Sequence, residues 1–404
     1  MSTSVLYRVF GLDAFEHVCA ESFLGLFLLT VRVRDRHVRC PGCLSPDVIR
    51  RGTRPRKVYA PPVGLRQTVL FIDVPRVQCE RCGQVRHVRL PGVVPGKNYT
   101  TAFRRLVLDL RKVMTVRDLA RYLNVSETLI RSIDKLWLGK KFGKPRLRHL
   151  KHLAIDEISV RKGHRYLTIV LDLDTGAVVF VGDGKGQTAL KPFWKRLHGS
   201  RAKVQAVATD MSSAYYAAVQ RNVPSATLVF DRFHIVKLMN EKLTTLRRDL
   251  FREASDQLER SVLKGTRWLL LKHPDNLDDE RNERQRLEDA LQINASLATG
   301  YYLKEDLRQI WEQKNGRAAG RFLKDWCARA QASGIRVLQT MANTLLRFRN
   351  GILNWYRYPI STGPLEGTNN KIKTLKRQAY GYRDLEYFKL RLMALHLAKF
   401  ELIG

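Results

Sequence analysis

Three short segments each hold one acidic residue where a metal-dependent nuclease would need a carboxylate. Asp156 lies within an apolar run, Asp210 ends another, and Glu366 follows a Gly-Pro turn at the start of a basic helix. An ionised side chain in an apolar run is costly unless a cation or hydrogen bonds compensate it. Taken singly, each acid is as often a helix cap or a loop residue.

The chemistry that three such carboxylates allow is phosphoryl transfer. Two divalent cations about 4 Å apart can activate a water or a 3′ hydroxyl and stabilise the leaving oxygen of an in-line displacement. Mg²⁺ and Mn²⁺ prefer hard oxygen ligands. We therefore predict that Asp156, Asp210 and Glu366 are catalytic and hold two Mg²⁺ or Mn²⁺ ions.

The order of elements between the acids predicts how they meet. The alternation of apolar residues predicts strands at 153–160, 166–173, 177–182, 204–209 and 227–230, with helices near 190–197 and 215–220 and a long helix opening at 231. This is the order of the ribonuclease H fold, in which the first and fourth strands are neighbours. Asp156 and Asp210 should therefore lie side by side, whereas Glu157 should point to the opposite face.

Four cysteines form two Cys-x-x-Cys pairs, Cys40/Cys43 and Cys79/Cys82, with 35 residues between the pairs. Four thiolates at this spacing suit one tetrahedral, structural Zn²⁺. Strand-like runs near 57–60 and 67–75 favour a zinc ribbon built on an extended β-hairpin. Redox pairing is the alternative, but a thioredoxin-like βαβ context is missing.

Residues 116–137 have the pattern of a helix-turn-helix. Predicted helices at 116–123 and 127–137 flank a turn at 124–126, and Ser126 caps the second helix. In this motif the second helix enters the major groove, although a plain helical hairpin fits the same pattern. The candidate DNA contacts on this helix are Thr128, Arg131, Ser132 and Lys135. A basic linker at 140–148, which opens with Lys140 and Lys141, either follows the DNA backbone or is a solvated hinge.

Overall charge agrees with a nucleic-acid partner. The net charge is +34, and residues 1–150 contain 29 Lys or Arg against 11 Asp or Glu. A polyanion is the obvious counterpart, although a ribosomal protein would also be basic. The apolar stretch 23–31 is too short to span a membrane and is flanked by charges, so we expect a cytoplasmic protein with no membrane segment.

Beyond residue 234 the strand signals give way to helical periodicity until about residue 358. We interpret this stretch as a helical insertion between the second and third acids. The helix that starts near Glu366 carries cations expected to lie close to a bound DNA end: Lys371, Lys373, Lys376 and Arg377.

Three groups of residues carry a resemblance to a known family: 154–158 with 161–168, Asp231-Arg232-Phe233-His234, and 363–367 with 369–381. They resemble the DDE transposases of the ISL3 family of bacterial insertion sequences. The resemblance implies DNA cleavage and strand transfer at terminal inverted repeats, with Asp156, Asp210 and Glu366 as the metal-binding triad. Asp231 and His234 match the acid-x-x-His signature of related transposases; a helix cap with a packed histidine fits them equally well.

The predicted fold class is therefore multidomain α+β: a zinc ribbon, a helix-turn-helix, and a ribonuclease H-like α/β core interrupted by an all-α insertion. The predicted boundaries are 1–95, 96–150, 151–240, 241–355 and 356–404. Expected partners are double-stranded DNA, as inverted repeats and target, and further copies of the chain, because two DNA ends must be handled together. The alternatives are a catalytically inactive, domesticated DNA-binding regulator and a structure-specific nuclease that cuts without joining.

Overall fold

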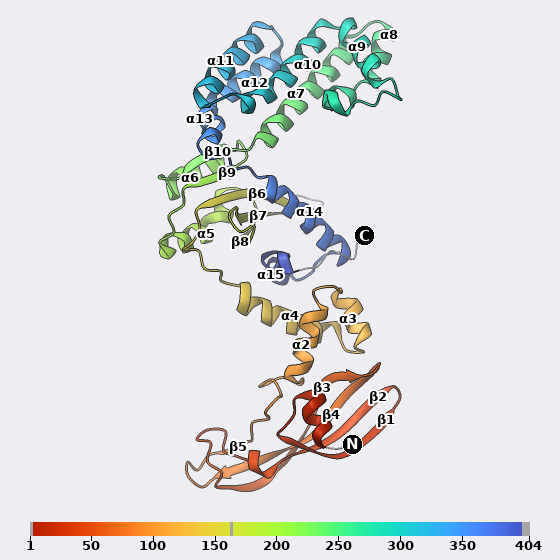
Figure 1. Ribbon diagram of the computed structural model, residues 1–404, viewed down its shortest axis with the longest axis vertical. Coiled ribbons are helices and arrows are strands. Elements are labelled where there is room, and N and C mark those ends of the chain that lie inside the picture. The colour runs from red at the N-terminus through yellow and green to blue at the C-terminus, as the bar shows by residue number, and fades with distance from the viewer. Residues whose placement is uncertain (1–2, 162–164, 398–404) are drawn as a thin grey trace. The chain divides into compact units, whose positions relative to one another are not determined.

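The computed structural model describes residues 3–161 and 165–397. The chain forms two compact units: Met1–Lys144 with Leu375–Gly404, and Pro145–Thr374 (Figure 1). The predicted multidomain α+β class is confirmed, because two separate sheets are accompanied by many helices.

The first unit opens with α1 (Thr3–Phe10) and a five-stranded sheet. Its strands are β1 (Phe15–Phe23), β2 (Leu26–Val33), β3 (Val48–Val63), β4 (Arg66–Cys79) and β5 (Val85–His87), in the order β1-β2-β4-β3 with β5 against β4. β3 and β4 form the extended hairpin that the cysteine spacing predicts. The hairpin pairs Val48 with Cys79, so the chain returns to its starting point after 31 residues (79 − 48). The apolar stretch 23–31 is largely β2, a core strand of this sheet.

Three helices follow: α2 (Thr101–Leu110), α3 (Val116–Tyr122) and α4 (Glu127–Phe142). Each begins after a hydroxyl side chain that accepts a backbone N–H three residues ahead; these caps are Thr100, Thr115 and Ser126. The predicted turn between α3 and α4 contains Asn124 at φ 52°. One prediction was wrong in detail. α4 continues five residues past Trp137, so Lys140 and Lys141 are helical and only the remainder of 140–148 is a linker.

The chain ends on this unit with α15 (Leu385–Met393), which packs against α4. Asp134 of α4 is buried and accepts a hydrogen bond from the Tyr387 hydroxyl at 2.5 Å and one from Arg111 Nε at 3.2 Å. At the start of α15, Asp384 forms an ion pair with Lys135 at 2.6 Å. Arg391 of α15 also pairs with the buried Asp134 carboxylate, at 3.5 Å, so this acid ties α4 to α15.

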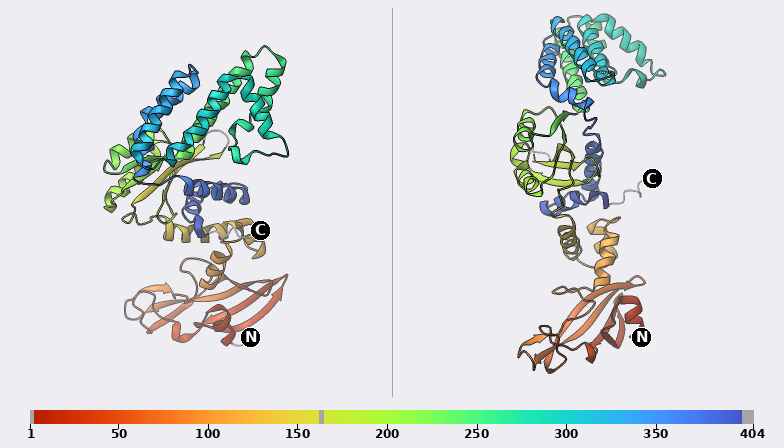
Figure 2. Two further views of the ribbon diagram at one scale, coloured as in Figure 1. Left: turned by 45° about the horizontal axis from the view of Figure 1, so that its top comes forward. Right: turned by 60° about the vertical axis from the view of Figure 1, so that its left-hand side comes forward.

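The second unit contains the predicted ribonuclease H-like sheet. Its strands are β6 (His152–Arg161), β7 (Arg165–Asp172), β8 (Val178–Asp183), β9 (Ala206–Thr209) and β10 (Thr227–Phe230), in the order β10-β9-β6-β7-β8. β6, β7 and β8 are antiparallel neighbours, whereas β9 and β10 run parallel to β6. The right-hand view of Figure 2 shows α5 (Gln187–Ser200) and α6 (Ser213–Asn222) on one side of the sheet and α14 (Gly363–Gln378) on the other.

The predicted helical insertion separates β10 from α14. Its main helices are α7 (Arg232–Glu253), α8 (Gln257–Gly265), α9 (Glu283–Ile293), α10 (Ala295–Arg308), α11 (Gly316–Ala332), α12 (Arg336–Arg347) and α13 (Arg349–Leu353). No strand occurs among the described residues between 231 and 362. Apolar residues of α7, α10, α11 and α12 join the core of the sheet in one continuous cluster. The insertion therefore shares one apolar core with the sheet.

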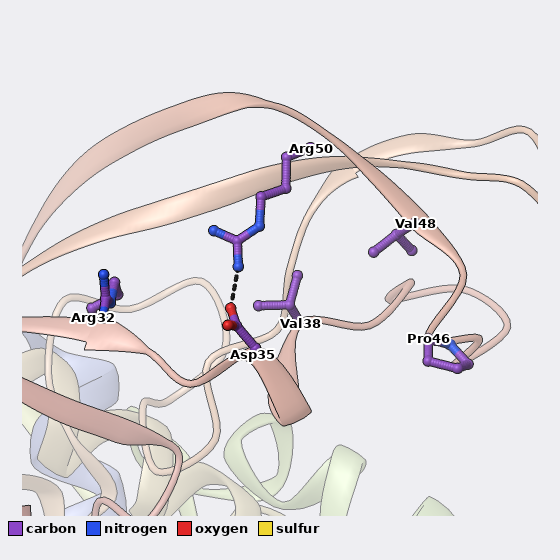
Figure 3. Close-up of a pocket in the computed structure, with 6 residues that line it drawn as sticks. All are labelled: Arg32, Asp35, Val38, Pro46, Val48 and Arg50. Carbon is purple, nitrogen blue, oxygen red and sulfur yellow. Dashed lines mark hydrogen bonds and ion pairs between the residues drawn. The ribbon is translucent and has the colours of Figure 1, made fainter.

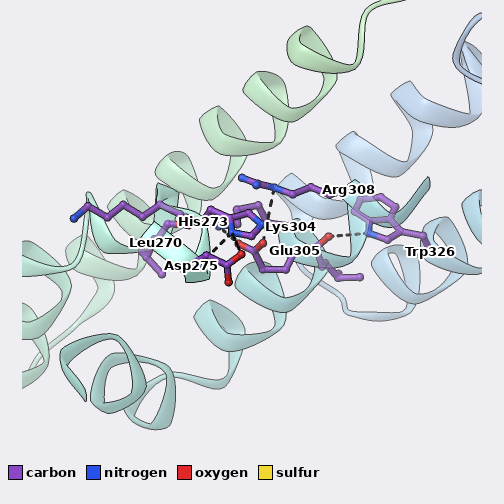
Figure 4. Close-up of polar contacts among 9 residues, drawn as sticks. Leu270, His273, Asp275, Lys304, Glu305, Arg308 and Trp326 are labelled. Atoms are coloured by element: carbon purple, nitrogen blue, oxygen red, sulfur yellow. Dashed lines mark hydrogen bonds and ion pairs between the residues drawn. The ribbon is translucent and has the colours of Figure 1, made fainter. Parts of the chain in front are cut away.

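Polar contacts inside the insertion fix its helices (Figure 4). The buried Lys304 ammonium donates to the backbone oxygens of Leu270 at 2.9 Å and Lys272 at 3.1 Å and pairs with Glu305. Trp326 is fully buried and donates from Nε1 to the Leu303 oxygen at 2.8 Å, so it is a core residue. Trp268, by contrast, is 64% exposed. Among the described residues, no helix combines the length and apolarity that crossing a membrane requires.

Candidate functional site

Strand register brings Asp156 and Asp210 together. β6 and β9 are parallel and pair Ala154 with Ala208, an offset of 54 residues (208 − 154). The same offset separates Asp156 from Asp210, and each acid lies two positions beyond its paired alanine. Side chains two positions apart on a strand share a face, and neighbouring strands lie about 4.8 Å apart. The prediction that the first and fourth strands are neighbours is therefore confirmed, and this pairing brings the two acids near each other where β9 ends.

The surroundings of the Asp210 side chain make its ionised form energetically unfavourable. Burial raises its pKa, and the negative charges of Asp156 and Glu157 raise it further. Two contacts act in the opposite direction: the positive charge of His234 and a hydrogen bond from the Ser212 backbone N–H at 3.2 Å. The balance still disfavours the ionised form, and a nearby divalent cation would reverse it.

α14 contributes residues to the face that carries Asp156. The Asn369 amide donates from Nδ2 to Asp156 Oδ2 at 2.9 Å, and the other carboxylate oxygen accepts the Glu157 backbone N–H at 2.7 Å. Glu366 precedes Asn369 by three residues, so both lie on the same side of α14. As predicted, Glu366 is in the first turn of this helix, but the helix begins at Gly363 and the Glu366 side chain is exposed.

The three acids approach one another less closely than the cysteines do. Three or more His, Cys, Asp or Glu side chains can hold one metal ion where their ligand atoms lie close together. Among the residues that the structure describes, the four cysteines are the one such group. Asp156 and Asp210 are neighbours by register, and Glu366 is placed near them by α14. The oxygen atoms of the three carboxylates are not close enough to one another to form such a group.

Asp231 connects the sheet with the start of α14. Its carboxylate is 2% exposed, caps α7 by accepting the Phe233 backbone N–H at 3.3 Å, and accepts the Thr362 hydroxyl. Its backbone N–H donates to the oxygen of Thr209, the residue before Asp210. Thr362 immediately precedes α14, and its oxygen accepts the Glu366 N–H at 2.9 Å. The helix cap predicted for Asp231 is observed.

His234, the other member of the acid-x-x-His pair, is half-buried in the first turn of α7. In its protonated form this side chain lowers the pKa of Asp210. Sequence reasoning recognised the pair but gave no sign that Thr362 is the partner of Asp231, because 131 residues separate the two.

Glu157 lies on the other face, as expected. Its Oε1 accepts hydrogen bonds from the Tyr215 hydroxyl at 2.5 Å and from the Gly186 backbone N–H at 3.2 Å. Tyr215 belongs to α6, and Gly186 caps α5. Glu157 therefore orients the helices behind the sheet, and Asp156 alone of the adjacent pair faces α14.

The four predicted zinc ligands form two backbone knuckles of the same design. In each, the residue after the second cysteine has a positive φ and donates its N–H to the oxygen of the first: Leu44 to Cys40 at 3.0 Å and Gly83 to Cys79 at 2.9 Å. The sulfur atoms of Cys40, Cys43, Cys79 and Cys82 all lie within 4.8 Å of one another. Hydrogen bonds from the Cys43 and Gly42 backbone N–H groups lower the pKa of Cys40 to about 6. The arrangement suits one tetrahedral ion bound by thiolates.

The side chains of α4 that are predicted to contact DNA differ in exposure and in whether they already bond to other residues of the chain. Thr128 is exposed, and Arg131 is half-buried and 3.5 Å from Glu127. Ser132 donates to the Leu129 oxygen at 2.8 Å, and Lys135 pairs with Asp384. Thr128 and Arg131 are therefore the most readily available for a ligand.

The other candidate cations are at the surface. Lys140 and Lys141 are exposed at the end of α4, and Lys141 lies 5.0 Å from the Trp137 ring centroid. On α14, the side chains of Lys371, Lys373 and Arg377 are exposed. The side chain of Lys376 is half-buried.

Figure 3 shows a shallow pocket on the N-terminal sheet where Arg50 pairs with Asp35. Arg32, also at this pocket, pairs with Glu16.

A zinc ribbon, a helix-turn-helix and a ribonuclease H-like core with adjacent acids together define a DNA transposase. Three family models match in the same order. The zinc finger of the transposases of IS204, IS1001, IS1096 and IS1165 matches residues 36–82, the helix-turn-helix domain of transposase family ISL3 matches 88–138, and the ISL3 transposase DDE model matches 153–392. The chain belongs to the ISL3 family of transposases.

Individual relatives agree. The transposase for insertion sequence element IS1001 of Bordetella parapertussis is 34% identical over 345 residues, covering 85% of this chain and 84% of that protein. The transposase for IS1557 of Mycobacterium tuberculosis is 28% identical over 381 residues, covering 87% and 85%. A chain of the Drosophila P element transposase strand transfer complex covers 67% of this chain and 82% of its own length at 11% identity, with a TM-score of 0.34. The last similarity is too low to bear on fold or activity.

The zinc knuckles generate the first prediction. Cys79→Ser removes one of four thiolates, so zinc measured by atomic absorption should fall from about one ion per chain to near zero. DNA affinity in a gel shift should fall with it. Cys19→Ser is the matched control, because Cys19 is exposed and lies outside the cluster. Full zinc content in Cys79→Ser would show that the four sulfurs do not form the site.

The contact between Asp231 and Thr362 generates a second prediction. Thr362→Val removes the donor and leaves a buried carboxylate oxygen unpaired, which should destabilise the catalytic core by about 1–3 kcal/mol in urea unfolding. Thr368→Val is the control. Thr368 is buried in α14, the helix that follows Thr362, but donates to the Pro364 oxygen of that same helix, so its loss should cost much less. Equal destabilisation by both variants would argue against a special role for the contact.

Proposed function

We propose that this transposase cleaves and joins DNA through a two-metal site formed by Asp156, Asp210 and Glu366. The observation that carries the proposal is the register of β6 and β9, which sets two acids side by side on the face of the sheet that meets α14. The environment of Asp210 also fits a cation, because burial and two neighbouring acids raise its pKa. Magnesium or manganese suits an all-oxygen donor set.

The divalent ions, when bound, supply activation of the attacking oxygen and stabilisation of the leaving oxygen. The chain's own residues would do the positioning. Asp156 and Asp210 are held by the sheet, and Glu366 approaches from a helix whose start is tied to Asp231. The exposed position of Glu366 is consistent with a ligand that closes on the site when DNA and metal arrive together.

DNA recognition falls to the other parts of the chain. The helix-turn-helix would read the terminal inverted repeats through Thr128 and Arg131, with Ser132 and Lys135 nearer the backbone. The basic side chains of α14, one to three turns beyond Glu366, would neutralise phosphates of the bound end. Because two ends must be joined to a target, we propose that a dimer or larger assembly acts on DNA.

One experiment separates this function from its two alternatives. A single-turnover reaction would contain labelled inverted-repeat DNA, magnesium and a target plasmid. A transposase cleaves the repeat and joins it to the plasmid, a structure-specific nuclease cleaves without joining, and a domesticated regulator only binds. Binding without cleavage in magnesium and in manganese would refute the catalytic proposal.

The active-site proposal predicts a separation of chemistry from binding. Asp156→Asn, Asp210→Asn and Glu366→Gln each remove a ligand charge with little change in shape. Each should abolish cleavage and strand transfer while inverted-repeat binding persists in a gel shift. Calcium in place of magnesium should act similarly, because its longer bonds and looser coordination do not reproduce the required geometry.

Two acids near the site serve as controls for these variants. Glu157→Gln keeps an oxygen that accepts from Tyr215 and Gly186, and Asp174→Asn alters a hairpin turn where Asp174 pairs with His152. Both variants should stay active. Strand transfer near the wild-type rate by Asp210→Asn would defeat the active-site assignment.

The recognition helix predicts a contrast between two cations. Arg131→Ala should cost about 1–3 kcal/mol on the specific repeat and relax preference at one or two base pairs. Lys141→Ala should weaken specific and random DNA alike and reduce the salt dependence of binding. Binding titrations at several salt concentrations measure both. Equal losses on both DNAs for Arg131→Ala would remove this residue from sequence reading.

A further inference from the structure

One side chain at the candidate active site is only half satisfied. Asn369 Nδ2 donates to Asp156 Oδ2 at 2.9 Å, but Asn369 Oδ1 is buried and has no hydrogen-bond partner. A buried polar atom without a partner is uncommon in folded proteins and calls for an explanation, of which an absent ion is one. Here the unpaired atom belongs to the same amide group that holds a candidate metal ligand.

The position of Asn369 is set by the fold. α14 is tied at its start through Thr362 to Asp231, and Asn369 lies one turn beyond Glu366 on the same side of the helix. The adjacent Asn370 shows the contrast. Its side chain is exposed, and its Oδ1 accepts from Lys373 Nζ at 3.4 Å. Two asparagines in sequence thus occupy different environments, and only one of them contacts an acid of the site.

The chemistry of an amide suits this place. Asn can donate from its nitrogen and present a neutral, hard oxygen at the same time. Amide and carbonyl oxygens are accepted as ligands by divalent cations that prefer oxygen. A fourth carboxylate at this position would repel Asp156 and could not donate to it, whereas an amide holds that acid in place without adding charge.

We propose that Asn369 is a fourth residue of the metal site: Nδ2 fixes the carboxylate of Asp156, and Oδ1 is a neutral ligand to the divalent cation that Asp156 binds. This inference rests on the proposed two-metal function. It assigns Asn369 a positioning role toward Asp156 and a binding role toward the ion. The unpaired Oδ1 is the observation that supports this role over simple packing of α14 on the sheet.

The test measures metal binding without relying on turnover. Full-length, zinc-loaded protein is titrated with Mn²⁺, and free Mn²⁺ is followed by electron paramagnetic resonance. Asp156→Asn defines the portion of binding that belongs to this site. Asn369→Leu, which has a similar shape but no polar atom, should weaken that portion about tenfold or more. Asn370→Leu should leave it unchanged.

Asn369→Asp separates ligation from packing. It keeps an oxygen but loses the donor, so the metal-free protein should melt at a lower temperature and Mn²⁺ should raise its melting temperature more than in the wild type. A purely structural Asn369 would lower the melting temperature equally with and without Mn²⁺. Zinc content and circular dichroism confirm that each variant is folded.

The outcomes are distinct. Wild-type Mn²⁺ binding by Asn369→Leu, with binding lost in Asp156→Asn, overturns the inference and leaves the proposed function intact. Weak Mn²⁺ binding by Asn369→Asp, equal to that of Asn369→Leu, also overturns it, because an oxygen at this position would then not be a ligand. Equal Mn²⁺ binding by wild type and Asp156→Asn instead refutes the proposed metal site itself.

Discussion

The parallel pairing of β6 with β9 is the constraint on which the candidate active site depends. Successive side chains of a strand alternate between faces, so a shift of one residue would turn Asp210 away from Asp156 and towards α5 and α6. Both strands have their flanking residues buried, with Leu153, Ile155 and Val207 in the core of the sheet. These three side chains share one face, and burial of that face specifies the register strongly. The same alternation sends Glu157 to Tyr215 and Asp156 to Asn369.

The third acid reaches this pair by a different device. Between β10 and α14 the chain makes a helical excursion of more than 100 residues, and the buried contact between Asp231 and Thr362 closes the excursion at its base. Loop-closure entropy grows only slowly with loop length, so a long insertion is tolerated once its two ends are held. The helices of the insertion also share one apolar core with the sheet, which keeps both ends in place. The start of α14, which carries Glu366, is therefore fixed next to the end of β10.

Much of this arrangement follows from patterns that are local in sequence. Alternation of apolar residues predicts the five strands of the core, and Cys-x-x-Cys spacing predicts the knuckles and their hairpin. Contacts between distant side chains have no such pattern, which explains why Asp231 with Thr362 and Asp156 with Asn369 were not foreseen. For Asn369 a weak signal exists, because it follows Glu366 by three residues on one helix. Helix α4 was predicted too short, although Gly143 marks the stop that the structure uses.

The C-terminal segment links the two functions of the chain through covalent continuity. α14 carries Glu366 in its first turn, and 18 residues later (384 − 366) Asp384 caps α15 and pairs with Lys135 of α4. Behind that pair, Asp134 is held by Arg111 and Tyr387 in a buried network that is costly to break. The helix proposed to read DNA is therefore braced by the segment that directly follows the proposed catalytic glutamate. Moving α4 away from α15 would break the contacts of the buried Asp134 carboxylate with Tyr387 and Arg391, so these two helices are held together.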